Sequence, residues 1–217
     1  MKYFKLTNST NLKEVGYFIQ TRGLPNGYTY KWFEQENSMT KLNIFELPNF
    51  IPDLIWELED NAKLTDIISA SNIRGKGFLM NKKAKELFVR YNIIEHKFHK
   101  SIVIYKGTNY EYFYLQLVKD DLNDIDFNKS LFCISNFVGK KVKSVSFSSY
   151  QEIISLQNNL DFGLIILAEK LKLNFYFYDL LFFPRVRNEI FISEIMLGHI
   201  LECNISGLEF SEQDIVT

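Results

Sequence analysis

The chain has 217 residues, a formal net charge of −1 and 47% apolar residues. This length can bury a sizeable core, and the near-neutral charge excludes the general basic field that drives nonspecific nucleic-acid binding. Two cysteines are too few for a disulfide framework, although they could form one disulfide bond. No apolar run is long enough to span a bilayer. Because the start also has no apolar signal segment, we expect a cytoplasmic protein without membrane association.

The first 53 residues are predicted to form one short strand followed by irregular chain. Tyr3 to Leu6 has the pattern of a strand. Gly, Pro and Asn gather between Arg22 and Tyr30, and two prolines lie between Leu47 and Pro52. Since these residues favour turns, and proline cannot donate a backbone hydrogen bond, we expect this part to cover other elements.

A repeated unit follows, first at about residues 54–105 and again at about 160–212. Moving Phe78–Phe98 forward by 112 positions (190 − 78) aligns it with Ile190–Phe210. Each copy contains a strand, a Lys-Leu pair, an Asp before two apolar residues, a turn, a capped helix and an Asn-Ile exit. One unit cannot bury its apolar faces alone, so we expect both copies to pack within a single domain, residues 1–217.

Four residues hold matching places in the two units. Asn81 and Ser193 come directly before the predicted helices, and both residue types accept hydrogen bonds from a first turn. Asp66 and Asp179 each precede two apolar residues, where an aspartate commonly fixes a turn by accepting from backbone N–H groups. We assign these four residues to structure. The apolar periodicity predicts the first helix over about Lys82 to Tyr91 and the second after Ser193.

The stretch between the units is predicted to be rich in strands. Four segments have strand patterns: Ser101 to Tyr105, Tyr110 to Val118, Leu131 to Ile134 and Val142 to Phe147. A hairpin turn is expected at Lys106-Gly107-Thr108-Asn109, and a short helix with a capping box is expected after Ser149. The sequence therefore predicts an α+β fold of mainly antiparallel sheet with a few helices, in two related strand-turn-helix halves.

The densest group of acidic residues is Asp120, Asp121, Asp124 and Asp126. The run from Asp124 resembles the start of a calcium loop. However, Lys129 stands where that loop needs Gly and no Glu closes it, so we expect no calcium site. Two interpretations remain: a solvated loop before a strand, or an acidic surface that meets a basic protein and speeds the encounter.

Motifs of known catalytic or nucleotide-binding chemistry are absent from the sequence. His96 and His99 would point to opposite faces of an extended segment, so they would not share a metal ion. His199 takes the place of Leu87 on the apolar stripe of the repeated helix, and we expect it to be buried and hydrogen-bonded.

Several segments resemble a known family. They are Ala62–Ile68, Tyr91–Phe98, Ile125–Phe132, Ile190–Glu194 and Asn204–Phe210. Together they look like the eleventh family of immunity proteins from bacterial polymorphic toxin systems, long catalogued as a domain of unknown function. The resemblance covers most of the chain from about Leu54. Its most specific parts are the Ile-Ser-Glu start of the second helix and the close from Gly207 to Phe210, and we count Gly207 among the structural residues.

The resemblance implies a cytosolic protein that binds and neutralises a cognate toxin domain, with no enzymatic activity and no cofactor. We take the acidic residues 120–126 as the candidate contact. Two other functions remain open. One is an enzyme with an aromatic-lined pocket in which Asp66, Asp126 or His96 converge. The other is a module that binds a sugar or nucleotide, since aromatic residues make up 16% of the chain.

Overall fold

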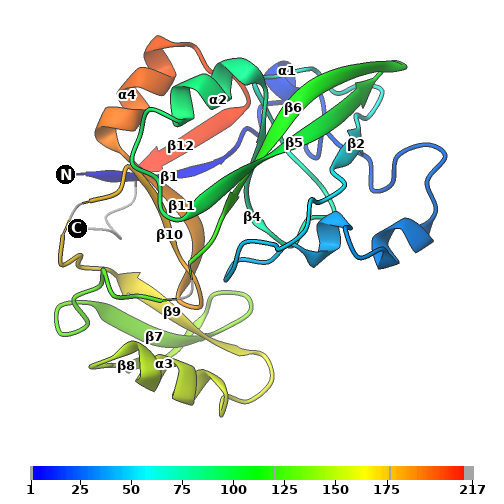
Figure 1. The fold of residues 1–217 in the computed structure, drawn as a ribbon. Helices are drawn as coiled ribbons and strands as arrows, with labels where there is room; N and C mark the ends of the chain where they lie inside the picture. The colour runs from blue at the N-terminus through cyan, green and yellow to red at the C-terminus, as the bar shows by residue number, and fades with distance from the viewer. Residues whose placement is uncertain (1, 120, 176, 213–217) are drawn as a thin grey trace.

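A computed structural model describes residues 2–119, 121–175 and 177–212 and shows an α+β fold (Figure 1). Within these residues the chain forms twelve strands in three sheets and four α-helices. All strand pairs in these sheets are antiparallel except the pair of β2 (Ile55–Glu57) and β5 (His96–Tyr105). The predicted α+β class with mainly antiparallel sheet is therefore confirmed.

The first sheet has the strand order β10-β11-β1-β12. Its strands are β1 (Tyr3–Asn8), β10 (Leu180–Phe183), β11 (Arg187–Ser193) and β12 (Leu208–Glu212). The predicted opening strand is thus not peripheral, because β1 lies between two strands from the far end of the chain (Figure 1).

The second sheet has the order β2-β5-β6-β4-β3. Its further strands are β3 (Ile67–Ile68), β4 (Lys76–Met80) and β6 (Thr108–Leu117). The turn between β5 and β6 holds only Lys106 and Gly107, with φ of 51° and 76°. Two consecutive positive φ values favour a tight turn that matches strand twist, so the hairpin is longer and its turn shorter than predicted.

The third sheet, β8-β7-β9, lies apart from the other two at the bottom of Figure 1. It comprises β7 (Leu131–Asn136), β8 (Lys141–Val145) and β9 (Leu164–Lys170), with α3 (Tyr150–Gln157) beside it. The Ser149 hydroxyl caps α3, as predicted, by accepting from Glu152 N. The Glu152 carboxylate, however, accepts from the backbone N–H and hydroxyl of Ser148 and not from Ser149.

The N-terminal part contains α1 (Leu12–Val15) and the 3-10 helices η1 (Tyr30–Glu34) and η2 (Met39–Lys41). The buried side chains of Trp32, Met39 and Leu42 belong to one apolar cluster with Trp56 and with side chains of β4 and β6. Most of this part has no regular structure, as expected, and it covers one face of the second sheet.

Helices α2 (Lys82–Phe88) and α4 (Glu194–Glu202) lie side by side at the top of Figure 1. Both follow the caps that the sequence predicts, and α2 ends three residues before its predicted end. Ala84, Leu87 and Phe88 of α2 and Met196 and Ile200 of α4 are buried in the main core, which they share with the first and second sheets. Helix amphipathicity thus joins the two sheets into one body.

The first two sheets share strand order and register. In each sheet a central strand pairs with the strand before the helix on one side and with the strand after the helix on the other. The aligned triplets are Ile190-Leu6-Phe210 and Phe78-Leu115-Phe98. β1 therefore has in the first sheet the place of β6 in the second, although it comes from the opposite end of the sequence.

The structural similarity between the two halves begins at Asp66 in the first half and at Asp179 in the second. The strands expected to open the two units, β2 and β9, lie in different sheets and have different neighbours. They are alike in sequence pattern because both are short apolar strands, and that pattern does not determine which sheet a strand joins.

Candidate functional site

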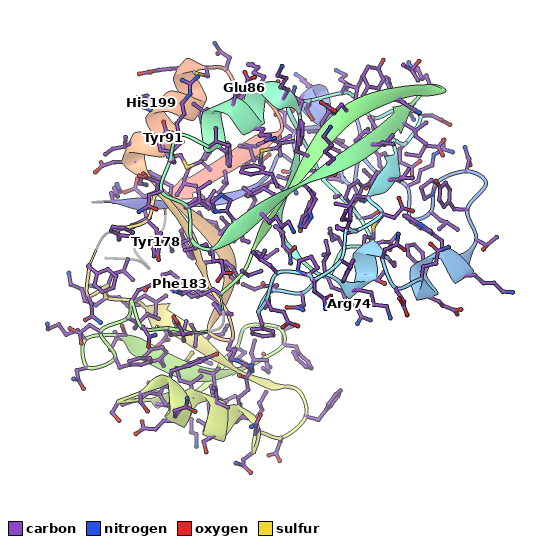
Figure 2. The ribbon with its side chains drawn as sticks, in the orientation of Figure 1. Arg74, Glu86, Tyr91, Tyr178, Phe183 and His199 are labelled. Carbon is purple, nitrogen blue, oxygen red and sulfur yellow. The ribbon has the colours of Figure 1, made fainter. Side chains whose placement is uncertain are left out.

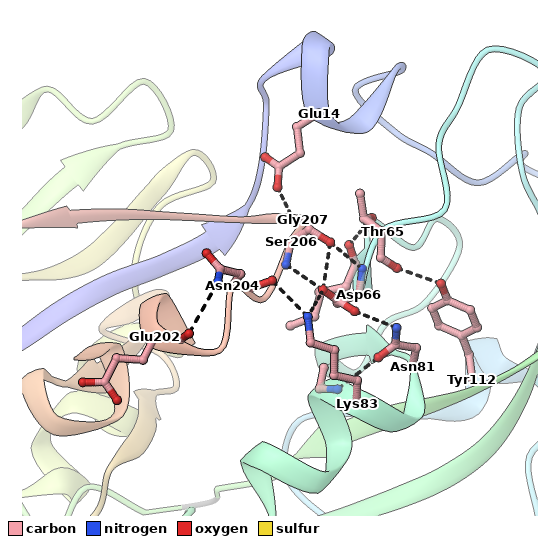
Figure 3. Close-up of polar contacts among 12 residues, drawn as sticks. Glu14, Thr65, Asp66, Asn81, Lys83, Tyr112, Glu202, Asn204, Ser206 and Gly207 are labelled. Atoms are coloured by element: carbon pink, nitrogen blue, oxygen red, sulfur yellow. Dashed lines mark hydrogen bonds and ion pairs between the residues drawn. The ribbon is translucent and has the colours of Figure 1, made fainter. Parts of the chain in front are cut away.

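Asp66 lies at a polar joint between the two halves (Figure 3). Its carboxylate accepts from Asn81 Nδ2 at 2.8 Å and from the backbone N–H and hydroxyl of Ser206 at 2.9 and 3.0 Å. The ammonium of Lys83 pairs with it at 3.1 Å. Asn81 Oδ1 in turn accepts from Ala84 N at 3.0 Å and caps α2. One carboxylate thus connects β3, the start of α2 and the chain that leaves α4.

Asp179, in the second half, makes the equivalent contacts to the first half. Its carboxylate accepts from the hydroxyl of Ser193 at 2.7 Å and from the backbone N–H of Asn92 at 3.1 Å. Ser193 Oγ accepts from Met196 N at 3.2 Å and caps α4. Each aspartate therefore binds the helix cap of its own half and the exit segment of the other half.

The electrostatics of Asp66 suit a structural role better than proton transfer. Burial raises the pKa of its carboxyl group. Hydrogen bonds from Ser206, Asn81 and Lys83 outweigh that effect and leave the pKa below its ordinary value. A general acid at neutral pH needs a raised pKa, which is the opposite of what this environment provides.

The three residues weighed for an enzyme have separate partners. Asp126 pairs with Lys129 at 2.9 Å, and His96 Nδ1 lies 2.8 Å from the carbonyl oxygen of Ile94. In the part of the chain that the structure describes, no hydrogen bond or ion pair joins either of them to Asp66. Among the same residues, no three His, Cys, Asp or Glu side chains are grouped as a metal site requires.

The acidic residues 120–126 are less open than their sequence suggests. Asp120 lies outside the described residues. Asp124 is buried, and the Lys119 ammonium lies 2.8 Å from its carboxylate and 3.3 Å from that of Asp121. Burial lowers the pKa of Lys119, but these two carboxylates more than compensate and raise it overall. The single ammonium of Lys119 therefore offsets one of the two negative charges of Asp121 and Asp124.

Asp126 is half-buried, and the Lys129 ammonium that pairs with it is exposed. That hydrogen bond holds the pKa of Asp126 below its ordinary value. The backbone N–H of Asp126 also donates to the Lys172 carbonyl at 2.8 Å, which fastens the loop to the chain after β9. A contact between this loop and a protein partner stays a prediction.

His199 is exposed, so the expectation that it is buried was wrong. The buried side of α4 is formed by Met196 and Ile200, and position 199 lies beside this stripe. The imidazole Nδ1 is hydrogen-bonded to the hydroxyl of Tyr91, in the segment that follows α2 (Figure 2). The expected hydrogen bond is present, and it connects the ends of the two repeated helices.

Sequence reasoning missed four exposed apolar side chains in β8 and in the turns next to the strands of the third sheet, which we call the apolar tip: Phe137, Val138, Val142 and Phe162. Their exposed fractions are 67%, 89%, 58% and 101%. The rings of Phe137 and Phe162 meet edge to face with centroids 6.0 Å apart. The sequence feature that could have indicated this surface is the apolar pair Phe137-Val138, directly before Gly139, because apolar residues in a turn tend to be exposed.

Strand β8 borders the apolar tip and forms an edge of the third sheet. Its residues 141–144 are all exposed. Lys141 pairs with Glu169 of β9 at 2.7 Å, and Lys140 and Lys143 are also exposed. An edge strand offers backbone N–H and C=O groups to another chain, so this surface combines apolar, basic and strand-pairing features.

No protein-family model and no curated protein matches this chain. The resemblance to the immunity family therefore stays a prediction from the five segments quoted above. No helix in the described part of the chain is long and apolar enough to cross a membrane.

Proposed function

We propose that this protein is an immunity protein that binds a cognate bacterial toxin domain and neutralises it by occluding or distorting it. The sequence resemblance supports this function. The observation of the structure that supports it best is the apolar tip, where two phenylalanines and two valines are left in solvent. In this proposal the chain acts by recognition in the cytoplasm, without bond-breaking chemistry or a cofactor.

The apolar tip fits the centre of a protein interface. Clustered exposed apolar side chains mark interaction sites, and phenylalanine is enriched in interface cores. A stable complex buries about 800 Å² on each partner, so the contact would extend from the tip onto neighbouring surface. The open edge of β8 is the adjacent surface best suited to this, because a partner strand can pair with it.

The toxin surface that meets the tip is expected to be apolar with an acidic border. Lys140 and Lys143 are exposed beside the apolar side chains and would meet carboxylates. Charges at such a border mainly speed association and favour the correct partner. The acidic loop is a second candidate contact, which would need a basic partner surface.

Co-expression with the product of the neighbouring gene tests the proposal. If that product is toxic, the wild-type chain should restore growth and co-purify with it. A double variant, Phe137→Ser with Phe162→Ser, should fold normally and lose both effects, because these side chains are already exposed. Phe18→Ser serves as the matched control, since Phe18 is 58% exposed on another part of the chain.

Two results would count against this account. If the neighbouring product kills cells and the wild-type chain neither rescues them nor co-purifies, the immunity function is wrong. If the double variant still protects while Asp121→Asn with Asp126→Asn does not, the function stands and the contact moves to the acidic loop.

A further inference from the structure

A cavity of about 430 Å³ lies where the first and second sheets approach each other. It is lined by residues of β1, β4 and β11, by Tyr114 of β6 and by the chain between β3 and β4. Small-molecule sites usually enclose roughly 300–1,000 Å³, so the volume is sufficient for a ligand. The elements that line it are distinct from the third sheet, which carries the apolar tip.

The cavity carries more positive than negative charge. Lys5 and Lys76 line it together with one carboxylate, that of Glu189. Glu189 is shared, because it lies 3.6 Å from the Lys5 ammonium and 3.3 Å from the Arg187 guanidinium beside the cavity. Lys76 donates to a neutral acceptor, the carbonyl oxygen of Asn188. Lys5 and Arg187 thus share the Glu189 carboxylate, and Lys76 has no ion pair among the residues that the structure describes.

The environment of Lys76 indicates a missing counter-charge. Burial lowers the pKa of its ammonium group, Glu189 opposes that effect, and Lys5 lowers the pKa further. Lys76 is half-buried, and a partly desolvated ammonium is stabilised when an anion binds next to it. A ligand with a negative group would supply the charge that the chain itself does not.

Two polar atoms of residues that line the cavity have no hydrogen-bond partner among the described residues: the hydroxyl of Tyr114 and Oδ1 of Asn8. Tyr114 is only 1% exposed, and burial raises the pKa of its hydroxyl, which therefore stays a neutral donor. Gly75 lies directly against it, because a Cβ there would stand only 3.1 Å from the hydroxyl oxygen. A buried donor without an acceptor costs free energy that a bound acceptor would recover.

We infer that this cavity binds a small molecule through a compact anionic group, a phosphate or a carboxylate, held by the ammonium groups of Lys76 and Lys5 and the hydroxyl of Tyr114. The apolar side chains of Ile68, Ala70 and Ile73 line another part of the cavity and would contact the body of the ligand. This site is independent of the toxin-binding proposal and can exist whether or not that proposal is correct.

Titration of the full chain with inorganic phosphate, and separately with acetate, tests the inference. Backbone amide chemical shifts would be followed by NMR at constant ionic strength, because both probes otherwise change screening. We expect at least one probe to shift the amides of β1, β4 and β11 in a saturable manner. The probe that binds more tightly identifies the group as phosphate or carboxylate, and the absence of saturable shifts with both overturns the inference.

Lys76→Met removes the ammonium and keeps most of the side-chain stem. We expect it to weaken binding of the preferred probe by about tenfold, since a charge-assisted hydrogen bond in a half-buried site is lost. Lys97→Met, the same change at an exposed position of β5, should alter the affinity by less than about twofold. Equal weakening by both variants would show that general surface charge, and no specific site, attracts the probe.

Tyr114→Phe tests the hydroxyl and also covers the case in which Lys76→Met fails to fold. The aromatic ring remains and can keep its packing against Trp56, with ring centroids 6.1 Å apart. We expect a folded variant with several-fold weaker probe binding. Unchanged binding in Tyr114→Phe would remove the hydroxyl from the site and contradict the inference as stated.

Discussion

At the scale of single residues, two aspartates organise the contact between the repeated halves. The sequence indicated Asp66, Asp179 and the two helix caps, because each acts on backbone close to it in the chain. It could not indicate their second partners. Ser206 is 140 residues from Asp66, and Asn92 is 87 residues from Asp179, so no local pattern connects them.

Asp66→Ala should lower the free energy of unfolding at neutral pH by about 1–3 kcal/mol, because several donors lose a buried acceptor. The pKa of Asp66 lies below its ordinary 3.8 in the folded protein, so its ionised form contributes stability above that pH. This contribution is lost as the pH falls through the folded pKa. Urea unfolding at pH 7 and near pH 3 should therefore show a smaller difference between variant and wild type at the lower pH.

Asp161→Ala is the control for this experiment, since Asp161 is exposed in the turn before β9. It should change stability by no more than about 0.5 kcal/mol at either pH. A difference between Asp66→Ala and wild type that grows on acidification would contradict the account of the joint.

Gly207→Ala should be among the most damaging single substitutions in the chain. The glycine has φ +90°, and a Cβ at this position would stand 1.9 Å from the carbonyl oxygen of Ile67. Gly139→Ala is the matched control, because its φ is +79° with nothing within 4 Å of the added atom. We expect a cost of about 1–2 kcal/mol at Gly139 from backbone strain alone.

At Gly207 we expect a loss of more than about 4 kcal/mol, or no folded protein, because clash with fixed backbone is added to the strain. Thermal and urea unfolding of the two purified variants measures both costs. Similar costs at the two glycines would mean that β3 and the segment before β12 do not approach as closely as the structure shows.

At the scale of elements, the helices were predicted better than the sheets. Caps and apolar periodicity placed the starts of α2 and α4 because these signals are local. The central position of β1 could not be predicted, since its partners lie near residues 190 and 210. The apolar tip was missed for a related reason. Apolar residues in a strand are expected to face another packed layer. Residues 141–144 of β8, at the edge of the third sheet, are exposed instead.

The shared register of the first two sheets predicts equal effects at equivalent positions. Leu6 of β1 and Leu115 of β6 are both buried and take matching places between their neighbouring strands. Leu6→Ala and Leu115→Ala should each lower the free energy of unfolding by about 2–5 kcal/mol. Leu131→Ala, at a residue 57% exposed, should cost less than about 1 kcal/mol. A small effect of Leu6→Ala in urea unfolding would show that β1 is dispensable for the first sheet.

At the scale of the whole molecule, side chains of all three sheets and of helices α2 and α4 belong to one continuous core, and the third sheet also carries the exposed apolar surface. Side chains that are already exposed need little rearrangement to meet a partner, which lowers the entropic cost of an interface on the third sheet. The fold class followed from the sequence. The division of roles among the sheets did not, because exposure depends on contacts between distant segments.

Amide hydrogen exchange on the free chain and on its complex with the neighbouring gene product tests the central claim most directly. We expect binding to slow exchange in residues 136–145 and around residue 162, with little change in residues 121–130. Absence of a complex would contradict the proposed function. A complex that protects residues 121–130 and leaves residues 136–145 unchanged would contradict the assignment of the contact to the apolar tip.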